Sequence, residues 1–274
     1  MMKKTLVYHL YVGKDIDINM CYKVHFECLK HFINLFDKVK FTISVDDLSD
    51  TDLIKKGIEW ILKLGFNCEM EIVTSLNSLY RESTTLYNQI LKSEDDELFF
   101  FFHSKGTTNF MDSAKSIDSV FIWICGIYYY SLHEDYNAVE ILEGTYRTMC
   151  GPFLLTPPEN GTGNFLQFYA GGGYWINNAS LKNLRKTNVI PELTVNNRYF
   201  AEKYPGMVLS TYDDYGLEGI NKKMVILGRV DGTSFYNGSS EDWNYIINLY
   251  PYPENFVSFV NYIGNKVGFI PFNE

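Results

Sequence analysis

The run LFFFFHSKG at 98–106 ends in the side chains best suited to chemistry in this sequence. His103 and Lys105 place two hydrogen-bond donors directly after a strongly apolar run, and Gly106 lets the backbone come close to a ligand. A lysine ammonium there could neutralise the charge of a phosphate or pyrophosphate leaving group. The alternative is a strand end whose histidine bonds backbone carbonyls. Polar residues that follow so apolar a run abruptly favour the functional interpretation.

A second candidate is the run GGGYWIN at 171–177. Glycines such as Gly172 and Gly173 permit either the close approach of a ligand or the tight packing of a helix on a strand. Trp175 and Asn177 add an aromatic face and an amide, the groups that commonly hold a sugar ring. The alternative is a glycine-rich corner around a core tryptophan, and the residues alone do not decide between the two.

The elements that must position these residues follow from apolar periodicity. Four apolar runs predict strands at 5–13, 39–47, 68–75 and 98–106. Amphipathic stretches between them predict three helices. One lies at 18–36, the second begins after the capping residue Asp50 and ends at Gly65, and the third lies at 78–92. Strands that alternate with helices predict a parallel sheet covered on both faces. Ligands gather at the carboxyl ends of the strands in such sheets.

The second half of the chain is less regular. We expect a helix at 119–132, a strand at 147–156, a surface loop at 156–164 and a strand that turns into a helix at 168–184. From about 206 onward the pattern indicates short strands and turns. The predicted fold class is therefore α/β, a mostly parallel sheet flanked by helices with an irregular C-terminal α+β portion, in a single domain over 1–274.

Composition narrows the functional classes. The chain has 274 residues, 46% of them hydrophobic and 21% charged, and a net charge of −9. That charge and the lack of a Lys/Arg-rich block argue against a nucleic-acid partner held by phosphate contacts. No apolar run approaches the roughly 18–20 residues of a transmembrane helix. The five scattered cysteines, which form no CxxC, predict reduced thiols in a cytoplasmic protein.

Three segments together resemble a known family. HSKG after an apolar strand, GGGYWINNASLKNL at 171–184 and NRYFAEKYPG at 197–206 resemble GT-A glycosyltransferases, in particular polysaccharide-type transferases of bacteria and large viruses. The resemblance covers about residues 5–206. It implies transfer of a sugar from a nucleotide-diphosphate sugar, with UDP favoured, to a glycan or another hydroxyl acceptor. It also implies that 1–106 binds the donor and 107–274 the acceptor.

The resemblance assigns roles to individual residues. His103 and Lys105 would act on the leaving group, and Glu202 resembles an acid that such enzymes carry near the acceptor. The positions implied for donor binding are Tyr11, Val12, Gly13, Asp46, Thr84 and Asn88. The positions implied for the sugar and acceptor are Gly172, Gly173, Trp175 and Asn177. Arg198 is a candidate phosphate clamp, with a surface ion pair as the alternative.

One departure from the family concerns the metal. GT-A enzymes commonly carry Asp-x-Asp after the fourth strand to bind Mn²⁺ or Mg²⁺, and this chain has His103-Ser104-Lys105 there. Either Lys105 replaces the cation or a histidine-assisted metal site exists. Two further functions stay open. One is a nucleotidyltransferase, although the segment after the first strand lacks the expected Gly-rich, Arg/Lys-bearing loop. The other is an inactive carbohydrate-binding or scaffold protein.

Overall fold

The computed structural model describes the N-terminal part of the chain almost continuously and the rest in pieces. The described residues are 2–77, 81–104, 117–134, 138–143, 148–152, 154–155, 168–169, 173–187, 201, 204, 224–227 and 254–269.

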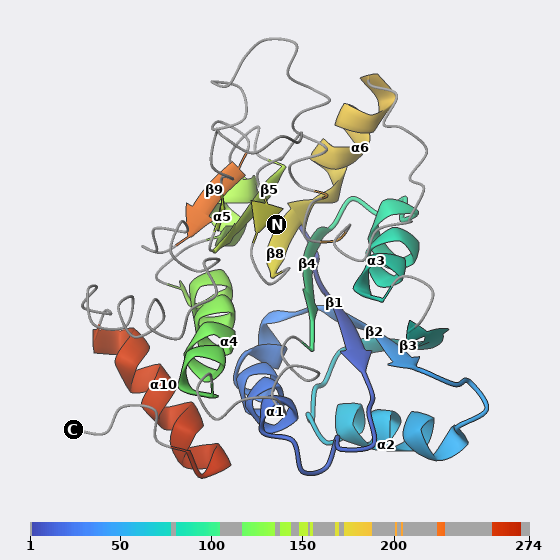
Figure 1. The fold of residues 1–274 in the computed structure, drawn as a ribbon. Helices are drawn as coiled ribbons and strands as arrows, with labels where there is room; N and C mark the ends of the chain where they lie inside the picture. Colours follow the sequence, from blue (N-terminus) through green and yellow to red (C-terminus); the bar gives the residue numbers. More distant parts are fainter. Residues whose placement is uncertain are drawn as a thin grey trace, which may run out of the picture.

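A seven-stranded sheet with the order β3-β2-β1-β4-β8-β5-β9 forms the centre of the structure (Figure 1). Its strands are β1 (Lys4–Tyr11), β2 (Lys38–Val45), β3 (Glu69–Leu76), β4 (Leu98–His103), β5 (Met149–Pro152), β8 (Tyr174–Asn177) and β9 (Met224–Leu227). β1 pairs in parallel with β2 and β4, β2 pairs in parallel with β3, and β5 with β9. β8 runs antiparallel to both β4 and β5. A separate antiparallel pair joins β6 (Leu154–Leu155) to β7 (Phe168–Tyr169).

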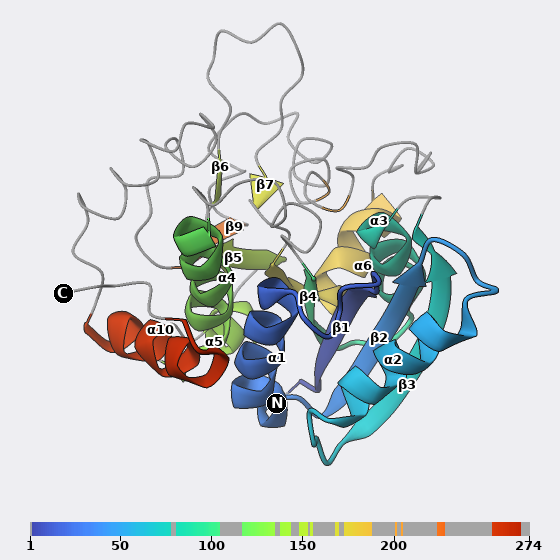
Figure 2. The same cartoon turned by 60° about the horizontal axis from the view of Figure 1, so that its bottom comes forward.

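Helices cover both faces of this sheet. The first face packs against α1 (Met20–Phe32), the 3-10 turn η1 (Ile33–Leu35), α2 (Thr51–Leu62), α4 (Ile117–Leu132), α5 (Ala138–Glu143) and α10 (Glu254–Val267). The second face packs against α3 (Glu82–Thr85), the π-helical segment η3 (Leu86–Leu91) and α6 (Asn178–Thr187). Figures 1 and 2 show α10, at the C-terminal end, beside α1 and α4 on the first face.

The alternation of side chains along the strands separates the two faces chemically. On β1, Leu6, Tyr8 and Leu10 belong to the core of the first face, and Val7 belongs to the core of the second. The second face also carries His9, which lies opposite Thr42 of β2 and His103 of β4 in the strand register. Paired residues of parallel strands project from the same face, so these polar side chains lie together.

The predicted fold class is confirmed, and so are several of its local signals. Asp50 accepts a hydrogen bond from the Leu53 amide at 3.1 Å and so caps α2. Gly65 has φ +72°, the left-handed backbone that a residue following a helix end requires and that glycine adopts without strain. Asn19 caps α1 through the Cys21 amide. Local hydrogen bonding therefore reinforces the apolar pattern of the first half.

Three elements differ from the prediction. The segment expected as one helix at 78–92 contains a single α-helical turn, α3, followed by the π-helical η3. The strand expected in 168–184 enters the sheet antiparallel to β4. The C-terminal region, where we expected strands and turns, contains α10, whose residues Phe256, Phe259, Val260 and Ile263 are buried against the first face.

Candidate functional site

The carboxyl ends of β1, β2, β3 and β4 meet at one edge of the sheet, and the residues that follow them form the candidate site. Tyr11 pairs with Ser44, and the amide of Val12 continues the β1–β2 ladder by donating to the Ser44 carbonyl at 2.8 Å. On the other side, the amide of Tyr11 donates to Ser104 Oγ at 2.9 Å. The first strand is thus fixed between β2 and β4 at this edge, which brings the predicted donor residues Tyr11, Val12 and Asp46 into one region.

Asp46 is an exposed carboxylate held by two donors from neighbouring strands. The Tyr11 hydroxyl donates to Asp46 Oδ2 at 2.9 Å, and Asn77 Nδ2 donates to Asp46 Oδ1 at 3.0 Å. Burial, followed by the hydrogen bond to Asp46, raises the pKa of Tyr11 to about 12, so the phenol stays protonated and donates. Each carboxylate oxygen keeps a further lone pair toward solvent. The arrangement therefore offers a fixed acceptor for ligand hydroxyl or N–H groups.

Arg81 adds a cation near this carboxylate, and the sequence analysis did not single it out. Its positive charge lowers the pKa of Tyr11, although burial raises that pKa by more. Because such an effect acts over a short range, Arg81 lies near the Tyr11–Asp46 pair. Its backbone has φ 50° and ψ −136°, and it is the one non-glycine residue with positive φ in the described chain. Strained residues of this kind cluster at functional sites, where surrounding structure holds them in place. No sequence pattern signals such a conformation for an arginine.

His103 and Ser104 lie at the end of β4, as predicted, and they are largely enclosed. His103 is 7% exposed and Ser104 5% exposed, and the Ser104 amide donates to the His9 carbonyl at 2.9 Å. His9, the register neighbour of His103, has Nδ1 2.8 Å from Thr85 Oγ1. Burial lowers the pKa of His9 from 6.5 to about 3, so this ring is neutral near pH 7. His9 is therefore a structural residue.

Hydroxyl groups line the second face next to this edge. Among the described residues, Thr42 Oγ1, Ser44 Oγ, Ser75 Oγ and Thr84 Oγ1 are buried without a hydrogen-bond partner. Ser44 lies opposite Tyr11 on one side and Ser75 on the other. Buried hydroxyls of this kind normally bond to protein, ordered water or a ligand. This row gives the space between the sheet and α3 a polar character.

The loop after β1 is folded back on itself. The Tyr22 hydroxyl donates to the Tyr11 carbonyl at 2.8 Å, and the Gly13 amide donates to the same Tyr22 oxygen at 3.1 Å. The Ile16 amide donates to the Gly13 carbonyl, and the amides of Ile18 and Asn19 donate to the Asp15 carbonyl. Most amides of this loop are therefore engaged within the protein. A Cβ at position 13 would lie 2.8 Å from Asp15 Oδ1, so a larger residue there would displace this carboxylate.

Comparison with known proteins adds little to this geometry. No protein-family model matches the chain, and no curated protein matches it in sequence. Among solved structures, it is similar to the 4-diphosphocytidyl-2C-methyl-D-erythritol synthase of Anaerococcus prevotii. That match has a TM-score of 0.42 and 10% sequence identity, and it covers 89% of this chain and 96% of the other. A likeness at this level does not decide between the transferase classes.

Trp175 does not form the accessible sugar-binding wall that we expected. It is 2% exposed, its ring lies 5.3 Å from that of Phe100 and 5.8 Å from that of Phe36, and its Nε1 donates to the Ser131 carbonyl at 2.7 Å. Gly173 serves packing, because a Cβ there would lie 2.2 Å from Ile127 Cγ2 of α4. Gly173 therefore allows close helix–sheet packing, and Trp175 is a core tryptophan.

Two predicted binding asparagines also have other roles. Asn177 pairs with Leu98, at the amino end of β4 and therefore at the edge opposite the candidate site. Its side chain donates to the Leu142 carbonyl and accepts from the Ser180 amide at the start of α6, which makes it a structural cap. Asn88 is exposed on η3 and accepts from Lys92 Nζ at 3.3 Å. It lies seven residues beyond Arg81, about 10 Å along a helix that leads away from the candidate edge.

Other predicted site residues lie outside the described part of the chain, namely Lys105, Gly172, Arg198 and Glu202. Within the described ranges, no three His, Cys, Asp or Glu side chains cluster in a way that could hold a metal ion. Asp46, with one carboxylate, does not by itself fit Mn²⁺ or Mg²⁺. The expected roles of Lys105 and Glu202 and a metal site remain predictions.

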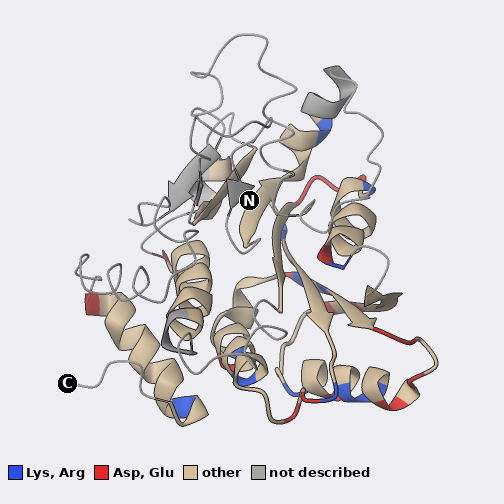
Figure 3. Ribbon diagram, viewed as in Figure 1, with Lys and Arg blue, Asp and Glu red and all other residues tan. Residues whose placement is uncertain are grey.

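Two further observations concern partners. In Figure 3 the lysines and arginines of the described chain are scattered over separate elements and form no continuous basic stripe. None of the helices in the described ranges has the length and apolar character that crossing a membrane requires.

Proposed function

We propose that the protein is a nucleotide-dependent transferase whose donor binds at the carboxyl edge of β1, β2 and β3. The observation that carries this proposal is the Asp46 carboxylate, fixed by Tyr11 from β1 and Asn77 from the end of β3. A carboxylate held in this way, with free lone pairs at the edge of a parallel sheet, suits the hydroxyl groups of a ribose or an N–H edge of a base. Arg81 would supply a positive charge near the donor.

Within this class, glycosyl transfer from a nucleotide-diphosphate sugar, with UDP favoured, is the leading function. The acceptor hydroxyl would attack the anomeric carbon, the bond from that carbon to the diphosphate oxygen would break, and the diphosphate would leave with the electron pair. Lys105 and His103 would stabilise the charge on the leaving diphosphate. Glu202 would take the proton of a glycan acceptor. Residues 1–106 would thus bind the donor, and 107–274 the acceptor.

Nucleotidyl transfer is the second candidate, and it corresponds to the name of the similar enzyme. A triphosphate donor needs several free backbone amides or cations at its phosphates. In the loop after β1, the amides of Val12, Gly13, Ile16, Ile18 and Asn19 already bond within the protein. That engagement leaves few amides of this loop for the phosphates of either donor. An inactive carbohydrate-binding or scaffold protein is the third candidate, and it predicts no turnover.

Calorimetry with UDP, GDP, CMP, their sugar derivatives and CTP tests the proposal. We expect at least one nucleotide to bind with a dissociation constant below about 1 mM, and Asp46→Ala to weaken that binding at least about tenfold. Asp52→Ala, which removes the same charge from an exposed position in the first turn of α2, is the matched control and should bind as the native protein does. If no nucleotide binds at about 1 mM, the proposal is wrong.

Product analysis separates the classes once a nucleotide is found. Release of a nucleoside diphosphate from the sugar donor in the presence of an acceptor supports glycosyl transfer. Release of pyrophosphate from CTP supports nucleotidyl transfer. Binding without either product supports the scaffold alternative.

A further inference from the structure

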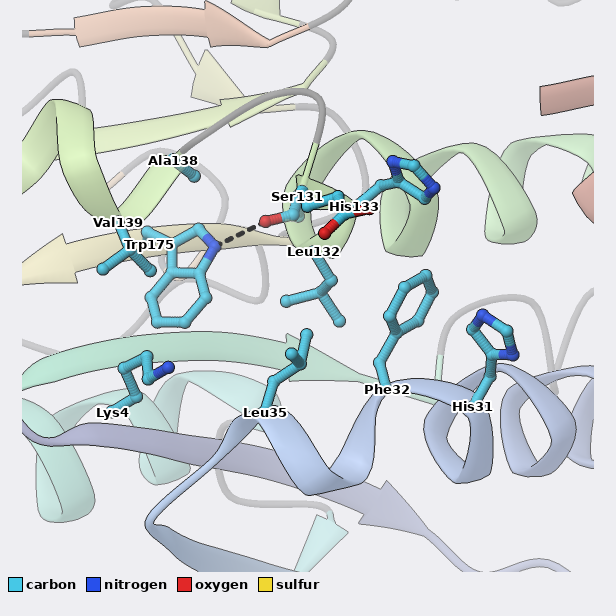
Figure 4. A pocket seen from close by; sticks show the side chains of 11 residues that line it. Lys4, His31, Phe32, Leu35, Ser131, Leu132, His133, Ala138, Val139 and Trp175 are labelled. Atoms are coloured by element: carbon cyan, nitrogen blue, oxygen red, sulfur yellow. Dashed lines mark hydrogen bonds between the residues drawn. The ribbon is translucent and has the colours of Figure 1, made fainter. Parts of the chain in front are cut away.

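A cavity of about 400 Å³ lies at the opposite edge of the sheet from the candidate donor site. It is lined by the start of β1, the end of α1 with η1, the end of α4, the start of α5 and the indole of β8. Figure 4 shows Lys4, Leu35, Phe32 and His31 along one side, and Trp175, Val139 and the end of α4 along the other. Cavities of this size, lined mainly by apolar groups with a few polar ones, are typical of small-molecule sites.

The apolar part of the lining comes from both sides. Phe32 and Leu132 are buried core residues whose side chains border the cavity, and Val139 is partly buried against the same core. Trp175 presents an edge of its indole there while its Nε1 is bonded to the Ser131 carbonyl. These walls favour a hydrocarbon or aromatic group over a fully hydrated one.

Two polar groups in this lining have no partner among the described residues. Ser131 is 2% exposed, and its Oγ is buried without a hydrogen bond. Lys4, half-buried at the start of β1, uses its backbone amide to bind Asp37, but its ammonium forms no ion pair within the described ranges. The neighbouring Lys3 and Lys38, by contrast, both pair with Glu69. Ser131 Oγ is enclosed and therefore out of reach of a ligand, whereas the unpaired ammonium of Lys4 beside apolar walls is complementary to one acidic group on an apolar body.

Other charges around the cavity act on such a ligand more weakly. Glu134 is exposed at the rim, where solvent screens its charge. The C-terminal ends of α1 and α4 point toward the cavity and oppose an anion, but several of their last carbonyls are already engaged. Ser131 O accepts from Trp175, Tyr129 O from the His133 amide, and Ile33 O from the Phe36 amide. The unpaired ammonium of Lys4 therefore remains the dominant charge facing a ligand.

We propose that this cavity, which we call the amino-edge cavity, is a second binding site for a small apolar carboxylate. The carboxylate would accept a hydrogen bond from Lys4 Nζ, and the apolar body would lie against Phe32, Leu35 and Val139. The cavity lies at the other end of the strands, and its lining shares no residue with the proposed donor site.

Calorimetry with 4-phenylbutyrate and hexanoate, and with the uncharged 4-phenylbutanamide as the matched probe, tests this site in the full chain. We expect at least one carboxylate to bind with a dissociation constant below about 1 mM and the amide to bind at least about tenfold more weakly. Lys4→Met should weaken carboxylate binding about tenfold, with an unfolding temperature close to the native value, since the Lys4 ammonium has no ion-pair partner to lose.

Lys55→Met is the control variant, because it removes an equal charge from an exposed position on α2 and should leave carboxylate binding unchanged. The proposal is overturned if neither carboxylate binds at about 10 mM, or if the amide binds as tightly as the acid. It is also overturned if Lys4→Met, folded as judged by its unfolding temperature, binds both carboxylates as the native protein does. None of these outcomes depends on whether a nucleotide binds at the carboxyl edge.

Discussion

Acid should destabilise the protein through His9, a residue buried between the sheet and α3. The ring is 2% exposed, its Nδ1 lies 2.8 Å from Thr85 Oγ1, and burial lowers its pKa from 6.5 to about 3. The unfolded chain takes up a proton at this residue as the pH falls through 6.5, and the folded chain does so only near 3. The contribution of His9 to stability is therefore fully present above pH 6.5 and is lost as the pH falls toward 3.

The size of this effect follows from the two pKa values. At about 1.36 kcal/mol per unit of pH, the full gap corresponds to about 5 kcal/mol, of which about 3 kcal/mol would be lost by about pH 4.5. Urea unfolding at about pH 7.5 and about pH 4.5 measures this loss. Comparison of variants is essential, because carboxylates and other histidines titrate over the same range.

His9→Leu removes the titrating ring and should lose about 3 kcal/mol less than the native protein between the two pH values. Thr85→Val is the matched control, because it removes the partner of His9 but keeps the ring buried, so its acid sensitivity should stay near the native level. Equal losses in the native protein and His9→Leu, within about 0.5 kcal/mol, would refute the assignment of acid sensitivity to this buried ring.

Two further predictions concern residues singled out in the sequence. Trp175→Ala should lower the free energy of unfolding by about 3–5 kcal/mol, because the ring packs on Phe36 and Phe100 and bonds Ser131. Urea unfolding checks this, and a loss below about 1 kcal/mol would contradict a core role. Once a reaction is identified, Lys105→Ala should reduce kcat by about 10²–10³ while turnover survives EDTA. Activity that EDTA abolishes and Lys105→Ala leaves intact would contradict cation replacement by Lys105.

The first half of the fold could be predicted because its signals are local. Strands such as VKFTISV alternate apolar with polar residues, and the capping residue Asp50 and the left-handed Gly65 mark the limits of α2 independently of the rest of the chain. The order of strands and helices then fixed which loops share an edge. Asp46 was expected at that edge and lies there, with Tyr11 bonded to it.

The remaining features depend on contacts between distant segments. Nothing local to Trp175 distinguishes an exposed sugar platform from a ring packed on Phe36, which lies 139 positions earlier in the chain. The antiparallel direction of β8 is likewise set by its partners β4 and β5. The helical pattern of ENFVSFVNYIGNKV, which forms α10, is present in the sequence and could have been found. The conformation of Arg81 could not, because positive φ at an arginine has no pattern.

The alternation along β1 bears on where a donor would lie. KTLVYHLY is apolar enough to look buried on both sides, yet Leu6, Tyr8 and Leu10 face one core and Thr5, His9 and Tyr11 face the other way. The first face is closed by aromatic packing, as where Tyr8 meets Phe102 with ring centroids 6.1 Å apart. The second face carries the partnerless hydroxyls of Thr42, Ser44, Ser75 and Thr84. A donor that our proposal places at Asp46 would therefore lie beside this polar second face, near α3, and away from the aromatic packing of the first face.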